Sequence, residues 1–241
     1  MKIGNSTGII LATLMISVLM LCRPAMALTV GPNANSIDIT NADVGKSFAV
    51  NWASEVGNCQ RTPELSATSV WEILGISATQ ITLNISLTNT SPESIWHLLK
   101  TAITSFGVGV SPNASAAFVV NGSGDIFDTV GHGSGPHQNF PGGVHNIDAC
   151  FSSANGCGGG SLWSGLQPGL TDVLTVALSG NFSAGAITLD LFPMKFKTKH
   201  GAYTLFGTVS ALPLPASLPL LGAALIGLGA LRRRKAAASA G

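Results

Sequence analysis

The stretch QITLNISLTNT, residues 80–90, decides the fold class, because apolar and polar side chains alternate along it without interruption. Such period-2 alternation is typical of a β-strand with one buried and one solvated face. The apolar positions are Ile81, Leu83, Ile85 and Leu87, and the polar positions are Thr82, Asn84, Ser86 and Thr88. We therefore expect this segment to be a strand of an antiparallel sheet.

Other segments carry the same signal, separated by turns rich in Gly, Asn, Ser and Pro. DVLTVALSG (172–180) and GAITLDLF (185–192) flank a turn at Gly180-Asn181 and form a candidate hairpin. Weaker strand patterns occupy 46–52, 67–74, 116–120 and 202–209. Short strands between turns favour a mainly β protein, with residues 28–210 forming an antiparallel β-sandwich.

One segment has helical signals instead. In SPESIWHLLKTAITSFG, residues 91–107, Ser91 suits the N-cap, Pro92 the first helical position and Gly107 the C-terminal stop. The apolar residues recur at helical spacing and are Ile95, Leu98, Leu99, Ala102, Ile103 and Phe106. We expect one amphipathic helix near 92–106, packed over an end or edge of the sheets.

Residues 121–169 are rich in glycine and are expected to form long exposed loops, interrupted by short strands such as 144–151. Cys150 and Cys157 lie close together within them, in CFSSANGC. In an exported protein such neighbours are readily oxidised, and the turn residues between them let the chain fold back. We expect a Cys150–Cys157 disulfide. Cys59 is then left over, and it is buried, pairs with one of the other two, or links two molecules.

The N-terminus has the parts of a secretory signal peptide, namely a basic residue, a short apolar run and a small-residue cleavage site. Lys2 precedes an apolar run over 9–21, and Ala25 and Ala27 form an A-x-A site. The run is about 13 residues, short of the roughly 20 that span a bilayer as a helix. We expect residues 1–27 to direct Sec export and to be removed, the alternative being an N-terminal anchor.

The stretch LPLPASLPLLGAALIGLGALRRRK, residues 212–235, joins a proline motif, an apolar run and a basic cluster. Residues 212–231 are uncharged, and about 20 residues at 1.5 Å each just cross a hydrocarbon core, although prolines weaken the first half as a helix. We expect 211–241 to contain a single transmembrane segment at 212–231, with the domain facing outward. The basic cluster would hold the end of the chain in the cytoplasm and consists of Arg232, Arg233, Arg234 and Lys235.

This tail resembles the PEP-CTERM sorting signal in the VPLPA form of exosortase substrates. The matching motif, with leucine in place of the usual first valine, is Leu212, Pro213, Leu214, Pro215 and Ala216. The resemblance implies export across the inner membrane of a Gram-negative bacterium and anchoring there. An exosortase-type membrane transpeptidase would then cut near the motif, leaving the protein at the cell surface or outside the cell. The alternative is an ordinary anchor that is never cut.

Two further expectations come from this resemblance. Such proteins are associated with exopolysaccharide and biofilm, which makes exopolysaccharide a partner to consider. The stretch HNIDACFSSANGCGGGS, residues 145–161, is also similar to the small PEP-CTERM family called cistern.

Charge separates the middle of the chain from its ends. Six of the twelve basic residues lie in the two terminal segments, whereas all eleven acidic residues lie between them. The middle domain therefore carries six basic and eleven acidic residues and a formal net charge of −5. This balance argues against nucleic acid or an anionic polymer as the main partner.

No pattern predicts catalysis, a metal site or a cofactor. The chain lacks G-x-S-x-G, and its glutamates are scattered. A zinc site drawn from His132, His137, His145 and Asp148 matches no helix face and would lie on glycine-rich loops. Asp125 and Asp128 lack the dense D-x-D-x-D pattern of a calcium loop.

The tryptophans offer one alternative function. Trp163, in a glycine-rich loop, is the best candidate for an exposed ligand contact, whereas Trp71 and Trp96 fall on or beside expected core positions. The sequence favours a non-enzymatic structural or exopolysaccharide-associated surface protein. The alternatives are a carbohydrate-binding module and, less favoured, a metal-dependent enzyme.

Overall fold

The computed structural model describes residues 28–54, 64–93, 100–122, 126–130, 138–154, 156–183 and 185–212. These residues form antiparallel sheets and two 3₁₀ helices, η1 (Pro32–Ala34) and η2 (Asn41–Asp43). None of the helices among these residues has the length and apolar character needed to cross a membrane.

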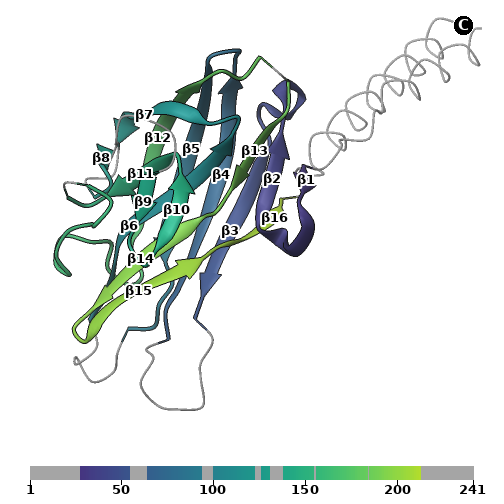
Figure 1. Cartoon of the computed structure of the whole chain (residues 1–241). Helices are drawn as coiled ribbons and strands as arrows, with labels where there is room; N and C mark the ends of the chain where they lie inside the picture. Colours follow the sequence, from purple (N-terminus) through teal and green to yellow (C-terminus); the bar gives the residue numbers. More distant parts are fainter. Residues whose placement is uncertain are drawn as a thin grey trace, which may run out of the picture. The chain divides into compact units, whose positions relative to one another are not determined.

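The first sheet has six strands, all paired antiparallel (Figure 1). The alternating stretch at 80–90 becomes one of its inner strands, with its apolar side chains buried and its polar ones partly exposed as expected. The strands are, in spatial order, β16 (Thr208–Ala211), β3 (Ser47–Ala53), β4 (Ser66–Ile76), β5 (Gln80–Asn89), β12 (Thr171–Gly180) and β7 (Ala114–Gly122).

The second sheet has eight strands and is organised around β6 (Thr101–Ser111). One edge of β6 pairs with β11 (Ala149–Ser152). The other pairs first with β14 (Pro193–Thr198) and then with β13 (Ile187–Asp190). Chain segments distant in sequence thus meet on one strand. The remaining strands of this sheet are β1 (Thr29–Val30), β2 (Ser36–Ile39), β8 (Thr129–Val130) and β15 (Gly201–Phe206).

Side chains from both sheets share one hydrophobic core. Trp71 on β4 contacts Phe106 on β6 edge-to-face, with ring centroids 6.2 Å apart. Phe48 on β3 and Phe192, between β13 and β14, have ring centroids 6.2 Å apart. Aromatic pairs of this geometry add about 0.5–1.5 kcal/mol each beyond the area they bury.

A third, two-stranded sheet packs near the middle of β6. It consists of β9 (Gln138–Phe140) and β10 (Val144–Ile147), and its apolar side chains form a separate cluster that includes Cys150. A Cβ placed on Gly107 of β6 would lie 3.0 Å from Ile147 Cδ1, so this small sheet packs directly against the strand. All ten residues from Thr101 to Val110 are buried, the earlier ones under residues 156–170 and the later ones under this small sheet.

The prediction of a helix near 92–106 is wrong for the part of that range that the structure describes. Residues 91–93 are not helical, residues 94–99 lie outside the described residues, and residues 101–106 belong to β6. The backbone of β6 pairs with strands on both of its edges, which gives its N–H and C=O groups partners without a helix. Because both faces are covered, the polar alternation that marks a half-exposed strand is missing.

The expected hairpin of 172–180 and 185–192 is also wrong. Both segments form strands, but β12 pairs with β5 and β7, whereas β13 pairs with β2 and β6 in the other sheet. The strands expected at 46–52, 67–74 and 116–120 are confirmed as β3, β4 and β7. The segments 202–209 and 144–151 are extended as expected, but each is divided into two strands that enter different sheets, β15 and β16 in the first case and β10 and β11 in the second.

Candidate functional site

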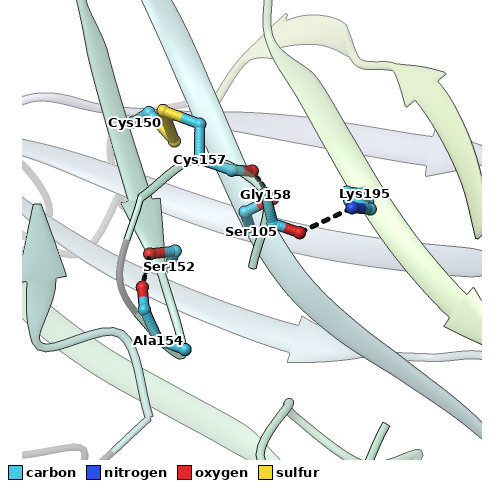
Figure 2. The surroundings of a disulfide bond; sticks show 7 residues. All are labelled: Ser105, Cys150, Ser152, Ala154, Cys157, Gly158 and Lys195. Atoms are coloured by element: carbon cyan, nitrogen blue, oxygen red, sulfur yellow. Dashed lines mark hydrogen bonds between the residues drawn. A yellow bond between two sulfur atoms is a disulfide. The ribbon is translucent and has the colours of Figure 1, made fainter. Parts of the chain in front are cut away.

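The disulfide between Cys150 and Cys157 is present, as the sequence predicts, with Cα atoms 5.7 Å apart (Figure 2). Cys150 lies on β11 and is fully buried, so the bond begins inside the fold. At the other end, the carbonyl of Cys157 accepts a hydrogen bond of 2.9 Å from the hydroxyl of Ser105 on β6. The disulfide therefore fixes the start of the following segment against the central strand.

We call that segment, residues 156–170, the glycine loop. Gly159 adopts φ +69°, and a Cβ at this position would lie 2.8 Å from the carbonyl oxygen of Thr104. Glycine is thus required both by the left-handed backbone and by the close approach to β6. The loop backbone can lie directly on the strand only because no side chain intervenes.

Two lysines of β14 reach across to the glycine loop. Lys195 Nζ donates a 2.5 Å hydrogen bond to the carbonyl of Gly158 (Figure 2), and Lys197 Nζ donates a 3.3 Å bond to the carbonyl of Gly160. Burial lowers the pKa of Lys195 from its ordinary value, and the nearby charge of Lys197 lowers it further. Hydrogen bonds to a charged donor are stronger than neutral ones, so these contacts stabilise the loop.

The far end of the loop is held as well. Leu166 exchanges backbone hydrogen bonds with Ile103 of β6, at 2.9 and 3.0 Å, and its carbonyl also accepts from the side chain of Asn89. Gln167 Nε2 donates to the carbonyls of Leu162 and Gly165. The backbone of the glycine loop is therefore anchored along its length, with hydrogen-bond partners on β6, β14 and β5.

Trp163 projects from this fixed loop and is 70% exposed. The ammonium of Lys100 lies 3.8 Å from the centroid of its ring, a cation–π contact that restrains the indole. The expected exposure of Trp163 agrees with the structure. An exposed indole on a restrained backbone can stack on an apolar ligand surface with little loss of conformational entropy.

Two of the other three tryptophans lie in the core. Trp52 and Trp71 are buried in the core, and Trp71 donates its indole N–H to Ser69. Trp96 lies outside the described residues, as does Cys59.

The residues weighed for a metal site do not come together among the described positions. His145 Nδ1 is 2.6 Å from Asn139 Oδ1, while Asp148 Oδ2 accepts a hydrogen bond from the Val110 backbone. His132, His137 and Asp125 lie outside the described residues. Within the described ranges, no group of three or more His, Cys, Asp or Glu side chains could hold a metal ion.

Leu212, the first residue of the proline motif, is the last described residue, and its N–H donates to the carbonyl of Ser47 at 3.3 Å. The rest of the predicted sorting and cleavage residues lie outside the described residues, namely Pro213, Leu214, Pro215, Ala216, Arg232, Arg233, Arg234, Lys235, Ala25 and Ala27.

Sequence reasoning missed the lysines of this region. The alternation in MKFKT, residues 194–198, places Lys195 and Lys197 on one face of a strand and could have revealed them. No local signal links Lys100 to Trp163, which lie in separate segments of the chain.

No protein-family model, curated protein or solved structure matches this chain.

Proposed function

We propose that this chain is an exported bacterial surface protein with a non-enzymatic, structural role in the exopolysaccharide or biofilm matrix. The signal peptide would direct Sec export, the tail would hold the chain in the inner membrane, and an exosortase-type transpeptidase would act near residues 212–216. The observation that carries the proposal is the order of proline motif, apolar run and basic cluster directly after the folded domain.

The positions at which the folded domain begins and ends support this assignment. Among the described residues, the first strand begins at Thr29, two residues after Ala27, and the last strand ends at Ala211, one residue before the proline motif. Cleavage at both predicted sites would leave β1 paired with β2 and β16 paired with β3. Processing would therefore release the domain from its membrane segments and leave every strand of the described residues in place.

The domain itself suits an extracytoplasmic location. We infer that its two sheets form a β-sandwich, supported by the core that they share. Its disulfide is of a kind that persists in oxidising compartments. A shared core and an oxidised disulfide both suit a domain that must stay folded outside the cell.

Localisation in the native bacterium tests the proposal. A reporter fused after Ser210 should be exported, and the full chain should reach the cell surface. A chain that ends at Leu212 keeps every strand that the structure describes, and it should be exported but lose surface retention. A reporter that stays in the cytosol, or a truncated chain distributed like the full chain, would contradict the proposal.

A second candidate function is glycan binding through Trp163, favoured by its exposure and by the restraint from Lys100. Binding on a glycan array should disappear in Trp163→Ala. Phe118→Ala, which removes an exposed aromatic ring on β7, should leave such binding unchanged. An array without any signal, or a signal that survives Trp163→Ala, would remove this candidate.

A further inference from the structure

A hollow of about 410 Å³ opens where β13 ends. Its volume lies within the range of roughly 300–1,000 Å³ that is usual for small-molecule sites. Residues from β2, β13 and β15 line it. The described lining includes neither Trp163 nor Leu212, so a role for the hollow goes beyond the proposed function and does not depend on it.

The hollow lies beside the two-residue connection between β13 and β14, where the strand geometry is interrupted. Leu191 adopts φ +50°, a left-handed conformation that is rare for a leucine. The next residue is held firmly, because the carbonyl of Phe192 accepts hydrogen bonds of 2.8 Å from both Trp52 Nε1 and the Gly207 backbone. Backbone strain of this kind persists where surrounding contacts impose it, and it clusters at functional sites.

Among the described residues, Asp190 contributes the only charge to the lining of the hollow. Its register partner on β6 is Gly109, where the missing side chain leaves room for the carboxylate. Burial raises the pKa of Asp190, so its environment solvates the charge poorly. Because the described lining holds no Lys, Arg or His, a ligand there would have to supply hydrogen-bond donors to this carboxylate.

The other walls combine hydroxyl and amide groups with one aromatic ring. Asn35, Ser36 and Thr188 provide polar groups. The hydroxyl of Thr188 already donates to Asp38 Oδ1 at 2.6 Å, which leaves its oxygen free to accept. Phe206, 57% exposed, adds an apolar surface. A ligand whose ring carries hydroxyl donors at its edge and an apolar C–H face would match both the polar and the apolar wall.

We propose that this hollow binds a neutral or amine-bearing sugar residue, with Asp190 accepting hydrogen bonds from the sugar and Phe206 covering its apolar face. An acidic sugar is disfavoured, because its carboxylate would approach Asp190 without a compensating cation in the described lining. The site therefore discriminates by charge as well as by shape.

Titration of the full chain with single sugars tests this assignment. The chain is kept in a detergent without a sugar headgroup, and the probes are the methyl glycosides of glucose, galactose, mannose and glucosamine, with methyl glucuronide as the acidic comparison. Saturation-transfer NMR and calorimetry report binding. At least one neutral or amine-bearing probe should bind with Kd about 1 mM, as expected for a ligand of this size. The glucuronide should bind at least about tenfold more weakly.

Matched variants locate the binding. Asp190→Asn and Phe206→Ala should each weaken it by about tenfold or more, since a charge-assisted hydrogen bond or an aromatic wall is lost. Glu72→Gln and Phe118→Ala, which change a carboxylate and a 53% exposed phenylalanine in the other sheet, should leave Kd unchanged. Thermal unfolding of each variant verifies that it is folded.

Three outcomes would overturn the proposal: no saturable binding of any neutral or amine-bearing probe, equal binding of the glucuronide, or binding that survives both Asp190→Asn and Phe206→Ala. Each is distinguishable from failure of the surface-protein proposal, because localisation and tail processing do not enter the measurement.

Discussion

The indole N–H of Trp52 donates a hydrogen bond of 2.8 Å to the carbonyl of Phe192, 140 residues later in the chain. Trp52 belongs to β3 of the six-stranded sheet, whereas Phe192 connects β13 to β14 of the eight-stranded sheet. The bond is buried and therefore joins the two sheets through a polar contact inside a hydrophobic core. It also fixes the wall of the hollow beside Asp190.

Trp52→Phe tests this connection. The substitution removes the donor and part of a buried ring, while the Phe192 carbonyl keeps its bond from Gly207. We expect the free energy of unfolding to fall by about 1–3 kcal/mol, measured by guanidinium denaturation followed by circular dichroism. Trp163→Phe, at an exposed position, should change it by no more than about 0.5 kcal/mol. Equal stability of the two variants would contradict the role given to Trp52.

Opening the disulfide should destabilise the fold moderately. Replacing Cys150 and Cys157 by alanine frees a ring of about eight residues, which corresponds to about 2.5 kcal/mol on the chain-entropy estimate. Either single variant opens the same ring, so its effect should approach that of the double variant. A double variant as stable as the native protein would show that the disulfide is dispensable for the fold.

Two adjacent glycines provide a sharp test of the contact between the glycine loop and β6. Gly159→Ala forces a Cβ against Thr104 at a positive φ and should cost about 1–3 kcal/mol. Gly158→Ala meets nothing within 4 Å and should stay within about 0.5 kcal/mol. Thermal melting curves of the two variants measure the difference, and a harmless Gly159→Ala would mean that the loop does not lie on the strand.

The pH dependence of the free energy of unfolding should report the ionisation of the Asp190 carboxyl group. Burial raises its folded pKa above the value of 3.8 for an unperturbed carboxyl, so the native state holds the proton more tightly than the unfolded state. The carboxylate therefore lowers stability, beginning as pH rises past 3.8 and reaching its full extent above the folded pKa. Asp190→Asn should be more stable at pH 7 by less than about 1 kcal/mol, because partial exposure screens the charge.

That gain should vanish below the unperturbed pKa of Asp190, where both side chains are neutral. Denaturation midpoints at several pH values, compared between native protein and variant, measure it. A variant that is destabilised at pH 7 would mean that the Asp190 carboxylate has a stabilising partner and is not poorly solvated.

The sequence predicts a strand best where one face of the strand is buried and the other is exposed to solvent. In β5 the alternation of Ile81, Leu83 and their polar neighbours leaves a single interpretation. In β6 it does not, because Ile103 and Phe106 also fit a helical spacing. The competing alternation in SFGVGVS, residues 105–111, has small residues in place of polar ones. Gly107 and Gly109 leave room for the small sheet of β9 and β10 to pack on β6, and a local pattern does not contain that contact.

Pairing between distant segments explains the remaining errors. The turn between β12 and β13 resembles that of a hairpin, yet the two strands enter different sheets to satisfy partners elsewhere in the chain. The Cys150–Cys157 disulfide was predictable because its residues are neighbours in sequence. The Lys100–Trp163 contact and the hollow beside Asp190 were not, since both depend on segments that only the fold brings together.

The most direct test of the central claim is the intact mass of the protein recovered from the surface of its native bacterium. Sorting and processing predict a chain that begins at Leu28 and ends near Pro215 or Ala216. Surface material that still carries the tail from Arg232 to Gly241 would contradict the proposed sorting.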